Sequence, residues 1–213
     1  IKTMKKNITI LFLLIWFTNS KAQNETISLS SSSARSSIAG AYYKDTENEF
    51  ISFLGSWTFT NGNKSFYMTL SKKTFYYDTT FNIYEDLIIG EYQFTENGIE
   101  KTNTLSLLSN PLIDPYDRNI VGNILLHKNN IPPCTDCQPS EKRLSLMFDD
   151  PTRNILGLSG EIELRRVDEN GIEKLKLTLR ETGNIILEDS IAPEFTSFNL
   201  PFVIYILTKP ESS

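Results

Sequence analysis

The sequence predicts an all-β protein, a single antiparallel meander that forms a barrel or a strongly bent sheet, with a β-sandwich as the alternative. Apolar residues alternate with polar ones at a period of two through most of the chain, as they do in strands with one buried face. Three Asn-Gly dipeptides separate alternating segments, and this pair suits hairpin turns. Both observations favour strands joined by short turns.

Each predicted strand is defined by apolar side chains at every second position. In chain order these are Trp57 and Phe59; Phe66, Met68 and Leu70; Tyr92 and Phe94; Leu144, Leu146 and Phe148; Ile162 and Leu164; and Leu175, Leu177 and Leu179. Residues 202–207 are apolar on both faces, which predicts a central or closing strand. The Asn-Gly pairs at 61–62, 97–98 and 170–171 predict three hairpins.

The N-terminal segment has the three parts of a secretory signal peptide. Lys5 and Lys6 precede an apolar run at residues 8–17, and Ser20-Lys21-Ala22 supplies a small-x-small cleavage site. The apolar run is shorter than the roughly 20 residues that cross a bilayer. We therefore expect residues 1–22 to be signal peptide with upstream residues, and the mature protein to be secreted, either periplasmic or extracellular, with no integral membrane segment.

Behind the leader, residues 23–38 are rich in serine and poor in apolar residues, which predicts a flexible segment. One β domain is expected at residues 39–209, followed by a short tail at 210–213. Cleavage removes four of the 21 basic residues and leaves 17 against 26 acidic ones, a net charge near −9. Because an acidic domain is repelled by phosphate backbones, we do not expect nucleic-acid binding.

Cys134 and Cys137 are the two cysteines of the chain and lie in a proline-rich irregular region at residues 108–141. In an oxidising compartment we expect a structural disulfide that closes a very small loop. A redox-active pair is disfavoured because no βαβ unit surrounds it. A metal site would need two further ligands, and His127 is the single histidine. We therefore predict no metal and no cofactor.

Catalytic signatures are scarce. Triad chemistry would depend on His127 alone, and neither a Gly-x-Ser-x-Gly elbow nor a His-Glu-x-x-His sequence occurs. A pair of carboxylates that converges in space, as in glycoside hydrolases, stays open as an alternative. Acidic turns near Asp114 and Asp149 have the oxygen-rich composition that calcium uses, but not EF-hand spacing. An activity is less expected than a binding role, although the sequence leaves the question open.

Adjacent tyrosines occur at 42–43 and 76–77. Wherever the chain is extended, the two members of a pair point to opposite faces, so one of each pair can be exposed. Exposed tyrosines suit sugar stacking or a protein interface, and core packing of one member with incidental exposure of the other is the plainer interpretation.

Two resemblances follow from these residues. Gly55-Ser56-Trp57 resembles the Gly-x-Trp signature of lipocalins, which implies a barrel whose Trp57 packs against a late arginine, here Arg180. More of the chain resembles an uncharacterised family of secreted flavobacterial proteins of the Bacteroidetes, a domain of unknown function. The matching segments are the Ala22-Gln23 leader end, residues 55–57 with 61–64, residues 86–90, the Asn97-Gly98 hairpin, and residues 200–201 with 207–209. The family resemblance implies a secreted β-rich domain and no assigned activity.

We therefore predict a secreted, non-enzymatic module. Its first form binds a small apolar or amphipathic ligand inside the barrel, with Trp57, Phe59 and Arg180 as ligand-binding candidates, and would fail if the interior is filled by side chains. Its second form is an envelope or extracellular protein-interaction module with an exposed aromatic patch. A carboxylate-dependent hydrolase is the third.

Overall fold

The computed structural model describes residues 24–31, 38–187 and 193–210. The predicted signal peptide at residues 1–22 and most of the predicted tail lie outside the described residues. The all-β prediction is confirmed: the described residues contain strands and short 3₁₀ turns and no α-helix.

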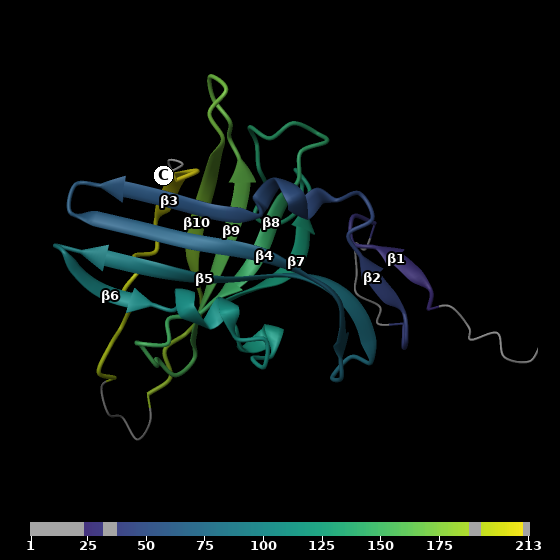
Figure 1. The fold of residues 1–213 in the computed structure, drawn as a ribbon, viewed down its shortest axis with the longest axis horizontal. Helices are drawn as coiled ribbons and strands as arrows, with labels where there is room; N and C mark the ends of the chain where they lie inside the picture. Colours follow the sequence, from purple (N-terminus) through teal and green to yellow (C-terminus); the bar gives the residue numbers. More distant parts are fainter. Residues whose placement is uncertain (1–23, 32–37, 188–192, 211–213) are drawn as a thin grey trace, which may run out of the picture.

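Within the described residues, eight antiparallel strands close into a barrel (Figure 1). These are β3 (Gly55–Asn61), β4 (Lys64–Asp78), β5 (Ile83–Glu96), β7 (Ile120–Leu126), β8 (Arg143–Phe148), β9 (Leu158–Arg166), β10 (Lys174–Gly183) and β11 (Ile204–Thr208). Each barrel strand pairs with the next barrel strand in the chain. β6 (Ile99–Asn103) pairs with β5 but is not one of the barrel strands. The meander prediction is therefore confirmed.

Two non-local pairings complete the wall. β5 pairs with β7 through residues 88–90, and β11 pairs with β3 only at Thr208 and Thr58. Residues 202–207 were expected to form a central or closing strand, and β11 does close the barrel.

The Asn-Gly pairs lie at the predicted hairpins. Both residues have positive φ at Asn97-Gly98 and Asn170-Gly171, as a type I′ turn requires, whereas at 61–62 only Gly62 does. The predicted strand faces follow from these turns, because each turn sets the pairing register of its two strands.

A four-stranded arm extends from the barrel (Figure 1, right). It consists of β1 (Thr26–Ser28), β2 (Tyr42–Lys44) and the ends of β4 and β5 at residues 71–87, and β1 and β2 run parallel to β5. The expectation of a flexible leader at residues 23–38 is wrong for β1 and the residue after it. Backbone pairing with β2 and burial of Leu29 hold this short segment against the sheet.

Side chains fill the barrel interior. Trp57, Phe66 and Met68 are 0 % exposed, as are inward leucines of β8, β9 and β10. A space large enough for water would leave exposed area on its lining, so none adjoins these residues. Ring contacts continue from Phe66 through Tyr92 and Phe148 to Phe198.

Non-strand segments cover the ends of the barrel. The 3₁₀ turn η2 (Glu49–Phe53) buries Phe50 and Phe53 and leads directly into β3. Residues 193–203, which precede β11, bury Phe198 and Leu200 against the core. We call this second segment the plug. Its backbone is anchored where Asn199 N–H donates to the buried carboxylate of Asp150 (2.7 Å).

Candidate functional site

The predicted ligand-binding residues are structural in part. Trp57 points into the core, and its indole N–H donates to the carbonyl of Phe53 (2.8 Å). Phe59 packs partly buried against Tyr205, with ring centroids 5.0 Å apart. Trp57 is fully buried and therefore borders no open cavity that could hold a ligand, while Phe59 is partly buried beside the core.

Arg180 does not cover Trp57. In β10 the inward positions are Leu175, Leu177 and Leu179, so Arg180 points outward and pairs with Glu163 (3.1 Å). The cations over the indole are Lys209, with its Nζ 3.9 Å from the ring centroid, and Arg166 at 5.3 Å. Lys209 and Arg166, and not the predicted Arg180, therefore lie over this tryptophan.

Lys209 is held over the indole by a hydrogen bond from its Nζ to the carbonyl of Leu54 (2.8 Å). Burial lowers the pKa of Lys209, and the nearby Arg166 lowers it further, while Glu173 opposes the shift. This end of the barrel is therefore sealed by η2, Trp57 and a cation that bonds to the backbone.

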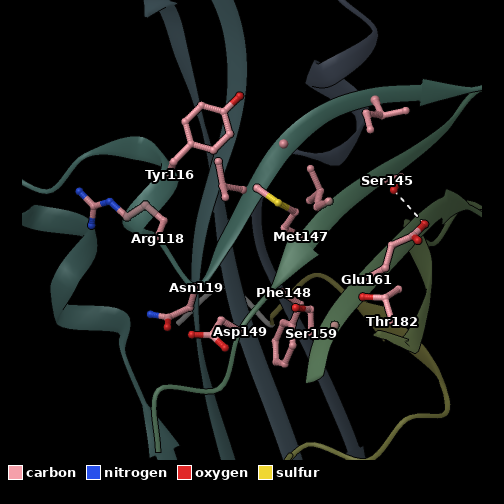
Figure 2. A pocket seen from close by; sticks show the side chains of 15 residues that line it. Tyr116, Arg118, Asn119, Ser145, Met147, Phe148, Asp149, Ser159, Glu161 and Thr182 are labelled. Atoms are coloured by element: carbon pink, nitrogen blue, oxygen red, sulfur yellow. Dashed lines mark hydrogen bonds between the residues drawn. The ribbon is translucent and has the colours of Figure 1, made fainter. Parts of the chain in front are cut away.

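The candidate site lies on the outer face of the barrel instead. A groove of about 450 Å³ runs over β7, β8 and β9 (Figure 2). Met147, which is 52 % exposed, lies between Tyr116 on one side and Glu161 on the other. The volume falls in the usual range of small-molecule sites, about 300–1,000 Å³.

Met147 forms the centre of the apolar floor of the groove, because its side chain points outward from β8. Leu144, Leu146 and Phe148 face the core, so Met147 projects from the barrel. A register irregularity between Val121 and Ile124 of β7 lies beside it. Val121 and Ile124 also line the groove and extend its apolar surface.

The rim of the groove is acidic. Asp149 and Glu161 both contribute, and Glu161 accepts a hydrogen bond from the Ser145 hydroxyl (2.9 Å). Partial burial raises the pKa of Asp149, a backbone hydrogen bond opposes this, and the neighbouring Asp150 raises it further. The carboxylate of Asp149 therefore accepts a proton at a higher pH than an ordinary aspartate.

The cation nearest the groove is already engaged. Arg118 is buried, its guanidinium points away from Met147, and it donates to the carbonyls of Leu107 and Asn110. It also lies 3.7 Å from Glu91. Arg118 thus fixes the segment that carries η3 (Leu105–Ser109) and η4 (Pro115–Asp117), including Tyr116 at the edge of the groove.

Cys134 and Cys137 form the expected disulfide. Their sulfurs and Asp136 lie within 4.8 Å of one another, but disulfide-bonded sulfurs are not thiolates and so do not suit a metal. Arg165 anchors this loop through Asp136 (2.7 Å) and Glu141 (2.5 Å). His127 accepts from Lys142 Nζ at 3.0 Å, so it supports the same loop.

Sequence reasoning missed the groove, although one signal was present. Met147 is a large apolar residue at a position that the alternation assigns to solvent. The other lining residues come from four strands, β7 to β10, and from the segments just before β7 and just after β8, and their proximity depends on the closed barrel.

A family model described as a family of unknown function (DUF6705) matches residues 4–210. The chain belongs to DUF6705. No curated protein and no solved structure matches. Membership in DUF6705 confirms the predicted domain of unknown function, while the bacterial source and the secretion implied by the resemblance stay predictions. Among the described residues of this DUF6705 member, no helix has the length and apolarity to span a membrane.

Proposed function

We propose that this protein is a secreted, non-catalytic binding module that holds a small amphipathic ligand with a basic group in its outer groove. The observation that carries the proposal is an exposed methionine floor beside two carboxylates, outside a barrel whose interior is packed. Met147 offers apolar contact, and Asp149 and Glu161 complement a positive charge. We keep the expectation of a lipocalin-like barrel, but we place the ligand in the outer groove and not inside the barrel.

The secreted location is supported by the disulfide, since such bonds persist in oxidising compartments. The predicted signal peptide at residues 1–22 agrees with it.

Calorimetric titration with three six-carbon probes tests the groove. Hexylamine should bind more tightly than hexanol, and hexanoate should bind most weakly, because the rim is acidic. Asp149→Asn should weaken hexylamine binding about threefold to fivefold, the effect of a partly exposed charge pair of roughly 1 kcal/mol. Met147→Gln should weaken hexylamine and hexanol alike.

The pH dependence gives an independent check. The Asp149 pKa lies above its ordinary 3.8. As the pH falls, this carboxylate therefore takes up a proton earlier than an ordinary aspartate would, and hexylamine binding should begin to weaken at that higher pH. Asp149→Asn should remove that component. Ile99→Gln changes another exposed apolar residue, on β6, and should leave binding unchanged. Equal binding of amine and carboxylate would refute the proposal.

A carboxylate-dependent hydrolase is the second candidate, because Asp149 has a raised pKa and shares the groove with Glu161. Such an enzyme would lose turnover of a glycoside substrate in both Asp149→Asn and Glu161→Gln. Absence of turnover across a panel of glycans would remove this candidate.

A further inference from the structure

A separate surface of the arm carries four aromatic side chains in contact, which we call the aromatic platform: Tyr42, Phe75, Tyr77 and Tyr84. Phe75 stacks on Tyr84 with centroids 4.4 Å apart and meets Tyr42 edge-on at 4.8 Å. Tyr77 lies 4.9 Å from Tyr84. Phe75 is 51 % exposed and Tyr77 42 %, so the rings meet solvent as well as one another.

The backbone at Phe75 is strained in a way that burial does not explain. Phe75 has φ of 53°, in the left-handed region that bulky side chains rarely adopt, at the register shift between Lys73 and Tyr76. A half-exposed ring gains little from burial in return. Strained residues of this kind concentrate at functional sites. The strain therefore points to a role for the exposed ring.

A buried carboxylate holds the platform in place. Asp86 is 0 % exposed and accepts hydrogen bonds from the Tyr42 hydroxyl (2.5 Å) and the Phe75 N–H (3.2 Å). Lys72 Nζ lies 3.2 Å from Asp86 and 2.9 Å from the buried Asp45, so one cation pairs with both carboxylates. On the far side of the platform, the Tyr77 hydroxyl donates to the Asn82 side chain (2.8 Å). The rings are thus ordered before any ligand arrives, which lowers the entropic cost of binding.

The platform and the groove lie on opposite faces of the sheet and have different chemistry. Tyr84 and Glu85 point to opposite faces of β5, and Glu85 accepts from Tyr116 of the groove (2.6 Å). The platform rings stand on three neighbouring strands, β2, β5 and β4. At a strand spacing of about 4.8 Å, these three strands span about 10 Å.

We propose that the aromatic platform binds a neutral polysaccharide. The C–H face of a sugar ring packs on the electron-rich surface of an aromatic ring. Phe75 and Tyr77 are the exposed rings of the platform, and Tyr84 supports both of them from below, so two neighbouring units of a sugar chain can each contact one exposed ring. The predicted net charge near −9 disfavours acidic polymers and nucleic acids. A stable protein interface needs about 800 Å² and 20–30 residues per partner, more than four rings provide.

Co-sedimentation of the full chain with insoluble cellulose, chitin, mannan and starch tests the proposal, with gelled calcium alginate as the acidic control. Wild-type protein should sediment with at least one neutral polymer and not with alginate. Tyr84→Ala and Phe75→Gly should each weaken that retention about fivefold or more, the scale of a lost aromatic contact of about 1 kcal/mol. Phe75→Gly is expected to fold, because glycine adopts positive φ without strain.

Tyr67→Ala is the matched control. Tyr67 lies on the outer face of the same strand, in its barrel part, so retention should not change. Met147→Gln in the groove should also retain binding, which separates this proposal from the proposed function. Failure to sediment with any neutral polymer, or an equal loss in Tyr67→Ala, would overturn it. So would folded platform variants that retain full binding.

Discussion

At the scale of single residues, hydrogen bonds to neighbouring elements fix the conformation of two residues in unusual positions. Phe75 is the main example, since its left-handed backbone is held by an N–H bond to Asp86. Lys209 is another, because it lies over the Trp57 ring while bonding to the carbonyl of Leu54. In both cases a polar contact to another element fixes the residue: the neighbouring strand of the same hairpin for Phe75, and a segment far away in the chain for Lys209.

Replacement of Phe75 separates backbone strain from ring contacts. Phe75→Ala and Phe75→Gly both remove the ring, but only glycine relieves the left-handed conformation. We expect the glycine variant to be more stable than the alanine variant by about 1 kcal/mol. Urea unfolding of the two variants measures the difference, and an alanine variant of equal or greater stability would contradict the assignment of strain.

At the scale of elements, charged side chains attach irregular segments to the barrel. Arg118 fixes the segment between β6 and β7, and Arg165 fixes the disulfide loop between β7 and β8. Asp150 holds the plug: one oxygen accepts from the backbone N–H and hydroxyl of Thr152, and the other from Asn199. These segments contribute few strand pairings, so their order depends on a few polar contacts.

Loss of the Asp150 carboxylate should loosen the plug. Asp150→Ala leaves the part-buried Asn199 N–H without its acceptor, which should cost about 1 kcal/mol, the lower end of the range for an unsatisfied donor. Hydrogen exchange at residues 193–203 should therefore accelerate more than exchange in β4 and β5. Thr152→Val is the milder comparison, because it keeps the Asp150 carboxylate and its bond to the Asn199 N–H and removes only the hydroxyl that accepts from the Asn199 side chain (2.6 Å). Uniform acceleration across the barrel would show that Asp150 supports the whole fold instead.

At the scale of the whole molecule, stability rests on barrel closure and a continuous aromatic and aliphatic core. The core extends from η2 at one end to the plug at the other. The disulfide closes a loop outside this core, with only two residues between its cysteines. It should therefore contribute locally.

Removal of the disulfide tests this division. The double variant Cys134→Ser/Cys137→Ser should fold with the same near-ultraviolet signal from Trp57, and its free energy of unfolding should fall by at most about 2 kcal/mol, the loop-entropy value for so short a loop. Denaturant titration with and without reductant measures it. Loss of the Trp57 signal would show that the loop is needed for barrel closure.

Much of the fold could be predicted because its signals are local. Alternation at Leu144, Leu146 and Phe148 identifies both a strand and its inward face, and Asn97-Gly98 marks the turn that sets a register. The leader prediction failed at β1, since its order comes from pairing with β2 and not from its own composition. Arg180 was predicted as the partner of Trp57 from the lipocalin-like motif alone. The motif does not show that position 180 points outward from β10, where Arg180 pairs with Glu163.

The sequence by itself determined the β class, the hairpins, the inward side chains and the cysteine pair, because each depends on residues close together in the chain. Only the tertiary structure decided the closure of β5 on β7 and of β11 on β3, the cation over Trp57, the groove and the aromatic platform. These features depend on contacts between residues far apart in the chain, and on register shifts at residues 73–76 and 121–124 that a period of two does not reveal.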